Sequence, residues 1–301
     1  MSVTLKVKNN IGTIEFDQKE SKVNLLTSDV IQLLDSILDE IKSREDINAL
    51  MITSAKRDVF IAGADIREIE NITEPEDGQQ KSQAGQKVLN KLEDLKIPTV
   101  AVIDGVALGG GCELVLACDY RIATFNEKVR IGLPEVNLGF VPGFGGTYRL
   151  PRLVGLVQGL KMILSGRPIT GKQALKGGLV DDLCPQVGLM DYAAKFMSRI
   201  LEQKNPVGKY ERRKKKGAER LFGDALFMHY MIFKKSRESV LKMTKGFYPA
   251  PLKAIDVVAE TYYLDRQKGL DIEAHIFSEL AVTQISKNLV KVFYLSEKYK
   301  K

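Results

Sequence analysis

Histidine and cysteine are scarce in this sequence, which contains only two histidines and three cysteines. Neither His229 nor His275 has a suitable partner near it in the sequence, which argues against Ser-His-Asp or Cys-His catalysis and against a His-rich metal site. Cys112 and Cys118 lie in an apolar run and Cys184 stands alone, so no Cys-x-x-Cys pair is present. We therefore expect reduced thiols, with neither a disulfide nor a bound metal.

Long apolar segments are also missing. No apolar stretch approaches the roughly 20 residues needed to span a bilayer. The N-terminus leads directly into the alternating pattern of Val3, Leu5 and Val7, without the charged start, apolar core and cleavage site of a signal peptide. The sequence therefore predicts a cytoplasmic protein without a membrane span.

The N-terminal part has the hydrophobic periodicity of strands and helices in turn. Asn9 and Asn10 separate two alternating apolar segments and predict a hairpin. A helix with one apolar face is expected at residues 28–41, with Ser28 as its cap, and a buried strand at residues 49–53. The polar stretch 71–83 contains a proline and a glycine and predicts a mobile loop.

The order of these elements predicts the fold class. Two strands, a helix and then further strand–helix pairs are typical of an α/β fold built from repeated strand-strand-helix units. Beyond residue 189 no strand pattern is found. We expect residues 1–189 to form one domain and residues 190–301 a second, all-α segment, interrupted at Pro206 and at residues 248–251.

Three consecutive glycines, at positions 109–111, stand directly before an apolar run with helical character. Amide N–H groups at the start of a helix point outward, and glycine leaves them open to a ligand. Such amides suit an oxygen that gains negative charge during a reaction, for example a thioester oxygen. The loop at residues 61–66 also consists largely of small residues and is a candidate for the second half of this anion site.

Two glutamates are candidates for acid–base catalysis. Glu113 is followed by four apolar residues, so we expect it to be partly buried and its pKa to be raised toward a range useful for proton transfer. Glu135 follows Pro134, which provides a rigid approach. If the two carboxylates face one pocket, one can handle water and the other a carbon-bound proton.

The residues alone leave other interpretations open. A run of glycines before a helix also serves close packing of backbone segments. A lone glutamate in an apolar run can lie at the rim of the core, or can be satisfied by a nearby arginine such as Arg149 or Arg152. Neither observation identifies a substrate.

Three motifs occur in a characteristic order: AGADI at 62–66, ALGGGCEL at 107–114, and LPEV with PGFGGTYRL within 133–150. Together they resemble the ordered signatures of the crotonase family, the enoyl-CoA hydratases and isomerases. The resemblance covers roughly residues 1–190. It implies the crotonase-type spiral of strand-strand-helix units.

The resemblance also implies roles for individual residues. The backbone N–H groups of Ala64 and Gly110 would form an oxyanion hole. Ala62, Asp65 and Ile66 would bind the substrate, with the backbone there holding the nucleotide end of coenzyme A. No metal is expected.

Family members differ at the two carboxylate positions, and hydratases keep both. The presence of Glu113 and Glu135 therefore favours the hydration of trans-2-enoyl-CoA to 3-hydroxyacyl-CoA in fatty-acid β-oxidation. Glu113 would activate the water that attacks C3, and Glu135 would deliver or remove the proton at C2. An additional Δ3,Δ2-enoyl-CoA isomerase activity is compatible with this site, and a dedicated isomerase would not need Glu113.

The segments 244–254 and 269–283 resemble the linker of multifunctional β-oxidation enzymes, which joins the hydratase to a 3-hydroxyacyl-CoA dehydrogenase. No Gly-x-Gly-x-x-Gly fingerprint follows a strand here, so we expect no bound NAD. Coenzyme A enters as part of the acyl-CoA thioester substrate, and no separate cofactor is expected. A 3-hydroxyacyl-CoA dehydrogenase or a thiolase, as a separate subunit, is the expected protein partner.

The C-terminal part of the chain carries an apolar stripe. Ala281, Ile285, Leu289 and Phe293 recur at helical spacing, and Lys287 is expected to point away from them. The resemblance implies that this stripe packs over the hydratase part. Closing a small helical bundle within residues 190–301 is the alternative.

Most of the net charge of +7 comes from one segment, residues 204–220, which holds eight basic and two acidic residues. This segment suggests an alternative function, a nucleic-acid-binding module in which Tyr210 and Phe222 stack on bases. A solvated helix face, or a positive rim for the phosphates of coenzyme A, explains the same charges. We do not expect nucleic acid to be the partner.

Overall fold

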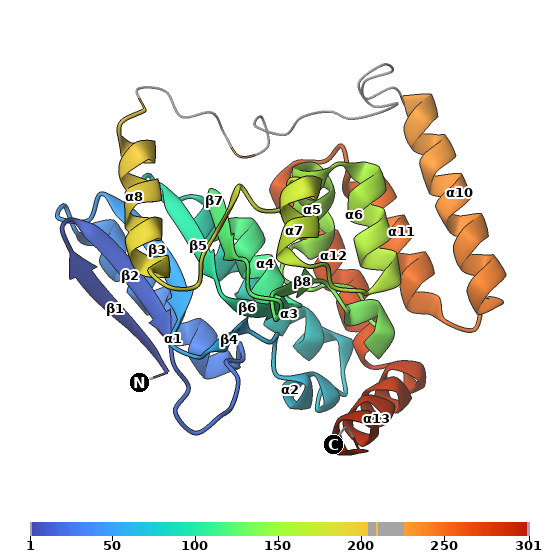
Figure 1. Cartoon of the computed structure of the whole chain (residues 1–301). Helices are drawn as coiled ribbons and strands as arrows, with labels where there is room; N and C mark the ends of the chain where they lie inside the picture. Colours follow the sequence, from blue (N-terminus) through green and yellow to red (C-terminus); the bar gives the residue numbers. More distant parts are fainter. Residues whose placement is uncertain (1, 204–208, 210–225, 300–301) are drawn as a thin grey trace. The chain divides into compact units, whose positions relative to one another are not determined.

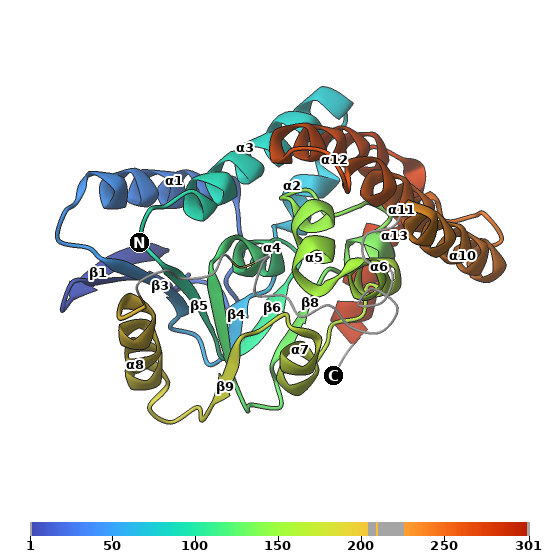
Figure 2. The ribbon, with the colours of Figure 1, turned by 90° about the horizontal axis from the view of Figure 1, so that it is seen from above.

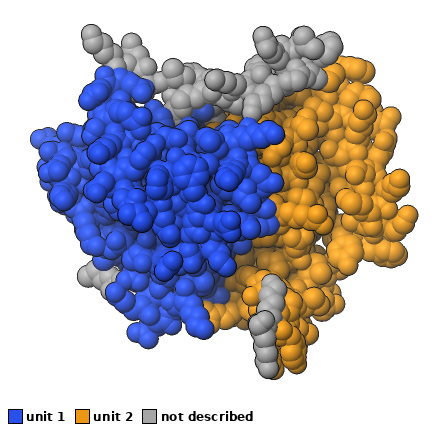
Figure 3. Space-filling view, viewed as in Figure 1, with its two compact units in different colours: residues 1–65, 87–132, 168–212 blue, residues 66–86, 133–167, 213–301 orange. Residues whose placement is uncertain are grey.

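The computed structural model describes residues 2–203, residue 209 and residues 226–299 (Figure 1). Contacts between Cα atoms group the chain into two compact units (Figure 3). Unit 1 comprises residues 1–65, 87–132 and 168–212, and unit 2 comprises residues 66–86, 133–167 and 213–301. Each unit is thus assembled from three separate stretches of sequence. The two units do not test the domain boundary predicted after residue 189, because that boundary marks where the family domain ends. It stays a prediction.

Unit 1 contains two sheets. The strands of the larger sheet are, in spatial order, β1 (Val3–Lys8), β2 (Ile11–Phe16), β3 (Ala49–Ser54), β5 (Thr99–Ile103), β7 (Tyr120–Thr124) and β9 (Asp182–Cys184). The strands of the smaller sheet are β4 (Asp58–Ile61), β6 (Gly105–Leu108) and β8 (Arg130–Gly132). The hairpin of β1 and β2 is antiparallel, and the other neighbouring strands of both sheets run parallel.

From β3 onward, successive strands alternate between the two sheets. The first strand of each pair joins the larger sheet, as β3, β5 and β7 do, and the second joins the smaller one, as β4, β6 and β8 do. Each strand-strand-helix repeat therefore extends both sheets by one strand. This confirms the predicted α/β fold with its spiral of repeated units.

The local sequence signals at the N-terminus are confirmed almost to the residue. Asn9 and Asn10 have φ angles of 51° and 60°, which a two-residue hairpin turn with the twist of its strands requires. The expected helix is α1 (Ser28–Ser43), but its cap is Thr27 rather than Ser28. The Thr27 side chain accepts a hydrogen bond from the N–H of Val30.

One apolar cluster of unit 1 lies between the larger sheet and α8 (Leu189–Leu201). Figure 2 shows α8 on one face of this sheet and α1 on the other. Alternate residues of three strands meet one stripe of α8, and the buried set is Ala49, Met51, Val100, Val102, Tyr120, Ile122, Ala193, Met197 and Ile200. Period two on the strands and spacing of three to four on the helix follow from the geometry of each element.

The described part of unit 2 is helical. Its elements are α2 (Ile66–Glu70), the 3₁₀ helix η1 (Glu135–Leu138), α5 (Gly146–Val154), α6 (Leu156–Ser165), α10 (Leu226–Thr244), α11 (Pro249–Thr261), α12 (Arg266–Ala281) and α13 (Gln284–Tyr299). In unit 1, α4 (Gly110–Ala117) and α7 (Gly171–Gly177) complete the helices, and α3 (Pro75–Glu93) begins in unit 2 and ends in unit 1. As predicted, the described residues beyond 189 contain no strand.

The predicted mobile loop at residues 71–83 is wrong, because helix α3 begins at Pro75. Proline is well tolerated in the first helical turn, where its missing N–H has no acceptor, and Glu76 and Asp77 complement the positive end of the helix. Gly78 serves close packing here. A Cβ at this position would lie 3.2 Å from Ser278 Cβ of α12.

Gly105 marks the point where the chain passes from the larger sheet to the smaller one. Its φ angle is +145°, and it pairs with Asp58 of β4. A Cβ at Gly105 would lie 2.0 Å from the carbonyl carbon of Asp58, which no shift of a side chain can relieve. Gly178 provides a comparison, because its φ angle is +80° but a Cβ there would have no atom of the described residues within 4 Å.

We expect Gly105→Ala to lower the free energy of unfolding by about 3 kcal/mol or more, because backbone strain and overpacking add at this position. Gly178→Ala should cost only about 1 kcal/mol, the penalty of a left-handed conformation alone. Urea denaturation of both variants measures the difference. Equal losses of stability would show that the close contact between β4 and β6 does not exclude a side chain at position 105.

Candidate active site

The predicted oxyanion residues Ala64 and Gly110 occupy equivalent places at the ends of two paired strands. β4 and β6 pair in parallel, with Ile61 opposite Ala107. Ala64 and Gly110 each follow three residues after these partners. Because parallel strands end at the same edge of a sheet, the register brings both backbone segments to that edge.

The N–H group of Ala64 is available for a ligand. Ala64 forms a parallel bridge with Leu26, in which Leu26 donates to the Gly63 carbonyl (2.8 Å) and accepts from the Asp65 N–H (3.4 Å). In a parallel bridge the central residue directs its own N–H and C=O away from the partner. Among the described residues, none accepts a hydrogen bond from the Ala64 N–H.

Gly110 presents its N–H at the start of α4, where the first amides of a helix lack intrahelical acceptors. The preceding Gly109 has a φ angle of +50°, and Gly111 packs directly on β4, so that a Cβ would lie 2.3 Å from the Ile61 carbonyl oxygen. The close-packing interpretation is therefore correct for Gly111, and it coexists with an open amide at Gly110. Both halves of the predicted oxyanion hole lie in unit 1, and their role stays a prediction.

Asn24 holds the segment that leads to Ala64. Its buried side-chain amide donates to the Phe16 carbonyl (3.2 Å), the Ser54 hydroxyl (2.9 Å) and the Phe60 carbonyl (3.1 Å). The backbone carbonyl of Asn24 accepts a hydrogen bond from the N–H of Ala62 (2.9 Å). One side chain thus joins three strand ends to the loop that carries the open amide.

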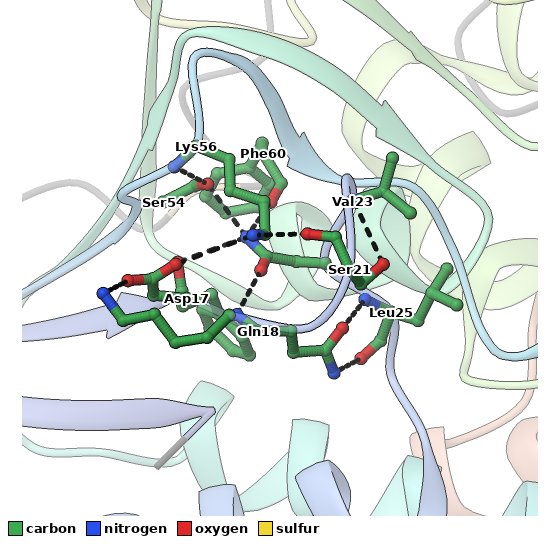
Figure 4. Close-up of polar contacts among 11 residues, drawn as sticks. Asp17, Gln18, Ser21, Val23, Leu25, Ser54, Lys56 and Phe60 are labelled. Atoms are coloured by element: carbon green, nitrogen blue, oxygen red, sulfur yellow. Dashed lines mark hydrogen bonds and ion pairs between the residues drawn. The ribbon is translucent and has the colours of Figure 1, made fainter.

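The loop around Asn24 is itself tied down by neighbouring polar contacts (Figure 4). The Lys56 ammonium donates to the Ser21 carbonyl (2.7 Å) and lies 3.6 Å from the Asp17 carboxylate. The Gln18 side chain exchanges two hydrogen bonds of 2.8 Å with the backbone of Leu25. The sequence analysis missed Asn24. A single amide side chain between apolar neighbours, at 23–26, is the signal that could have indicated it.

Glu113 lies in the first turn of α4 and is buried more fully than predicted, with 2% of its surface exposed. A carboxylate in this position is stabilised by the positive end of the helix. Asp65 is also buried, and Ile66 begins α2. Glu113 belongs to unit 1 and Glu135 to unit 2. That the two glutamates face one pocket stays a prediction, as does substrate binding by the segment around Asp65.

Glu135 is the first residue of η1 and is 7% exposed. Its Oε2 atom is buried, and no described group donates a hydrogen bond to it. Burial, and then the negative charge of Glu273, raise the pKa of Glu135 to about 8. A raised pKa favours the protonated form of this carboxyl group. The alternative that an arginine satisfies it is not supported, since no ion pair to Glu135 is formed within the described ranges.

The short helix η1 is held by side chains from distant parts of unit 2. The Asn137 amide donates to the Gly166 carbonyl (3.2 Å), and the Ser286 hydroxyl of α13 donates to the Leu138 carbonyl (3.1 Å). A Cβ at Gly139 would lie 2.8 Å from the Cα of Ser286, so the two backbones are in close contact. The C-terminal helix α13 thus packs on the element that carries Glu135.

The face of α13 that makes these contacts coincides only in part with the predicted stripe. Of that stripe, Ala281 at the end of α12 is buried and Leu289 lies beside Gly139. Ile285 is 38% exposed, and Ser286 and Val290 are buried in its place. Lys287 was expected to point away, but its ammonium donates to three carbonyls at the end of α2, those of Ile69, Glu70 and Ile72. The Ile69 carbonyl also accepts from the N–H of Ile72 (3.2 Å). A cation is favourable at the C-terminal end of a helix. Polar contacts therefore decide which face of α13 is buried.

The described lysine of the basic segment is not available for phosphate groups. Lys209 is 7% exposed, pairs with Glu93 (2.7 Å) and donates to the carbonyls of Leu116 and Ala117 at the end of α4 (3.0 Å each). The other residues of the segment 204–220, and Phe222, lie outside the described residues. The nucleic-acid alternative thus loses one of its basic residues.

The described part of the chain was searched for metal sites, disulfides and membrane-spanning helices. There, no group of three or more His, Cys, Asp or Glu side chains is arranged to hold a metal ion. The three cysteines are buried thiols, and burial raises the pKa of Cys118 to about 12. None of the described helices combines the length and the apolar character needed to cross a membrane.

Comparison with known proteins identifies the family. The family model described as enoyl-CoA hydratase/isomerase matches residues 6–238. The chain belongs to this family. The predicted membership in the crotonase family, and with it the prediction of an enzyme, is confirmed.

Relatives and solved structures agree with this family. Fatty acid oxidation complex subunit alpha of Shewanella sp. (strain ANA-3) is 40% identical over 294 residues, which are 98% of this chain and 41% of that protein. The same subunit of Idiomarina loihiensis is 38% identical over 299 residues, 99% of this chain and 41% of that protein. The chain therefore spans about two fifths of the length of these relatives, as the resemblance to the hydratase part of a larger enzyme implied.

Two crystal structures show the fold of the family. Enoyl-CoA hydratase from Bacillus anthracis is 25% identical, with a TM-score of 0.63, over 99% of this chain and 97% of that one. Human mitochondrial Δ3,Δ2-enoyl-CoA isomerase is 19% identical, with a TM-score of 0.71, over 100% of both chains. The second likeness concerns the fold alone.

Within this family fold, the contacts of Asn24 generate a prediction. Asn24→Ala leaves two buried carbonyls and the part-buried Ser54 hydroxyl without their donor, so the free energy of unfolding should fall by about 2–3 kcal/mol. Hydrogen exchange should become faster at Ala62, whose N–H bonds to the Asn24 carbonyl. Asn288→Ala, at an exposed position of α13, is the control and should change neither quantity. Unchanged exchange at Ala62 in Asn24→Ala would contradict the assigned role.

Proposed function

We propose that this chain hydrates trans-2-enoyl-CoA thioesters to 3-hydroxyacyl-CoA, the hydration step of fatty-acid β-oxidation, with Δ3,Δ2-enoyl-CoA isomerisation as a second activity. The observation that carries the proposal is Glu135, a buried carboxyl group with an unpartnered oxygen and a pKa of about 8. Such a group can hold a proton at neutral pH and transfer it to carbon. Family membership supports the substrate class.

In the proposed reaction, Glu113 acts as the base and Glu135 as the acid. Glu113 accepts a proton from water while the water oxygen bonds to C3. The electron pair of the C2–C3 double bond moves toward the thioester and forms an enolate, and C2 then takes the proton of Glu135. Exchange with solvent returns the proton from Glu113 and restores Glu135 for the next turnover.

The amides of Ala64 and Gly110 stabilise the enolate oxygen in this scheme. Both belong to backbone held by strand pairing and close packing, so they need little reorganisation when the charge develops. Loss of one such donor typically costs about 10²–10³ in rate. Ala62, Asp65 and Ile66 are proposed to hold the nucleotide end of coenzyme A.

Hydration involves no net oxidation or reduction, so the proposed reaction needs no redox cofactor. We propose that coenzyme A enters only as part of the acyl thioester. The relatives named above are alpha subunits of a fatty acid oxidation complex. The proposed partner is therefore a 3-hydroxyacyl-CoA dehydrogenase, which oxidises this product, or a thiolase, which cleaves the 3-oxoacyl-CoA formed by that oxidation.

We expect the protein to consume crotonyl-, hexenoyl- or decenoyl-CoA, measured as loss of the enoyl-thioester absorbance. Protonation of C2 requires the acid form of Glu135, so kcat/KM for hydration should decline as the pH rises above about 8. Folded protein that converts none of the three substrates would disprove the proposed function. A rate that stays constant well above that pH would disprove the role of Glu135 as the acid.

Substitution of each glutamate should separate the two roles. Glu113→Gln should lower hydration by about two to four orders of magnitude, the usual effect of losing a general acid or base. Isomerisation of 3-enoyl-CoA requires no added water, so it should survive better in Glu113→Gln than in Glu135→Gln. Both activities are measured on proteins with wild-type thermal midpoints. If each variant loses both activities equally, the assigned division of labour is wrong.

A further inference from the structure

Helix α12 contains a fully buried carboxylate that the proposed reaction does not use. Glu273 is 0% exposed, and four groups donate hydrogen bonds to it. These are the N–H of Gly145 (2.5 Å), the N–H of Thr147 (2.8 Å), the hydroxyl of Thr147 and the side-chain amide of Gln86 (3.3 Å). All of these residues lie in unit 2.

Glu273 supplies what the start of helix α5 lacks. The residue at the N-cap position of α5 is Gly145, which has no side chain to accept from the first amides of the helix. Unsatisfied amides at a helix start attract an anion. A carboxylate that follows more than 120 residues later in the chain therefore closes this helix, in place of a local capping residue.

The same face of α12 holds the loop between η1 and α5. Phe277, one turn beyond Glu273, meets the ring of Phe140 edge-to-face at 5.5 Å between centroids. A Cβ at Gly143 would lie 3.2 Å from the Phe277 ring, and the Gly143 carbonyl accepts from the Ser82 hydroxyl (2.5 Å). The loop is thus fixed along its length by α12 and α3.

This loop matters because few hydrogen bonds orient the Glu135 carboxyl group. It is bonded by its own backbone N–H, and no described group donates to Oε2. With Oε2 unpartnered, the carboxyl group of Glu135 depends on the backbone of η1 and of the loop that follows. A displacement of about 1 Å at a reacting group can cost about 100-fold in rate. The contacts that fix this loop therefore also fix the position of the Glu135 carboxyl group.

We propose that Glu273 is a positioning residue for Glu135: by binding the amides that begin α5, it fixes the loop that orients the Glu135 carboxyl group. The inference rests on the proposed hydratase function and deepens it. Glu273 contacts no reacting atom, and its effect reaches the substrate through Glu135. Helix α12, in the C-terminal all-α segment, thereby contributes to the site.

Electrostatics gives the proposal a second, independent observable. The negative charge of Glu273 contributes to the raised pKa of Glu135, and burial raises the pKa of Glu273 as well. Removal of one of two neighbouring carboxylates should therefore lower the pKa of the other.

The charged groups on the elements around α12 leave this interaction in place. Both cations of α5 donate to backbone carbonyls, Arg149 to that of Phe144 and Arg152 to those of Tyr148 and Thr261. On α13, Lys287 is bound to carbonyls of α2. On α11, Lys253 pairs with Glu279 at the exposed side of α12, where both side chains are more than 40% exposed. The α3 group that bonds to Glu273 is Gln86, which is neutral.

The test compares Glu273→Gln with Glu279→Gln, a matched change on the exposed side of the same helix. For hydration of crotonyl-CoA, we expect Glu273→Gln to lower kcat by about 10–100-fold, with KM changed less than about threefold. The alkaline limb of its kcat/KM profile should move to lower pH. Glu279→Gln should retain the wild-type rate and profile.

Two further variants separate position from charge. Glu273→Asp keeps the negative charge but is too short to reach the same donors, so kcat should fall while the alkaline limb stays near that of the wild type. Thr147→Val removes only the hydroxyl donor and should give a smaller loss of kcat than Glu273→Gln, even if the latter folds poorly. Thr147→Ser, which keeps the hydroxyl, should restore the rate.

The outcomes distinguish this inference from the proposed function. Titration of the Glu135 carboxyl group by ¹³C NMR, with Glu135→Gln for assignment, tests the coupling without any turnover. Should the wild type not hydrate enoyl-CoA, the proposed function fails, while an unshifted Glu135 titration in Glu273→Gln overturns the inference by itself. Loss of thermal stability with unchanged kcat and an unchanged alkaline limb would mean that Glu273 serves folding only.

Discussion

β4 and β6 pair in parallel with Ile61 opposite Ala107, and the candidate site depends on this register. Both strands end at the same edge, and the two segments that follow them carry the open amides of Ala64 and Gly110. The approach is close enough that only glycine fits at position 111. A slip of one residue would turn the paired residues to opposite faces and separate the two amides. The alternation of strands between two sheets maintains the pairing.

Two buried carboxyl groups of unit 2, those of Glu273 and Glu135, differ in their hydrogen bonding. Glu273 receives four hydrogen bonds, whereas one buried oxygen of Glu135 has no donor among the described residues. An unsatisfied buried polar group costs about 1–3 kcal/mol, so folding stability alone does not favour Glu135. Such exceptions to local rules are concentrated at functional sites, and the surrounding structure compensates for them. Here the hydrogen bonds of Glu273 to the amides that begin α5 are part of this compensation, because they hold the loop before that helix.

Polar side chains also explain where sequence patterns misled. The apolar stripe on the last helix predicted burial of Ile285, but Ser286 and Lys287 face inward because backbone carbonyls of η1 and α2 need donors. The polar stretch at 71–83 predicted a loop, yet most of it is helical, because proline suits a helix start and a glycine allows α12 to approach. Hydrophobic periodicity does not report requirements of this kind.

The sequence by itself determined the family, the α/β class with its repeated units and the hairpin at Asn9-Asn10, because each rests on contiguous motifs or on local periodicity. It also singled out Glu113 and Glu135, both of which are buried in the structure. Only the tertiary structure decided that Asn24 joins three strand ends and that Glu273 closes helix α5. A hydrogen bond between residues more than 100 positions apart produces no periodic pattern in the sequence. A glutamate therefore looks the same in the sequence whether or not its carboxylate finds donors in the fold. Which backbone groups lack partners is known only once the elements have packed.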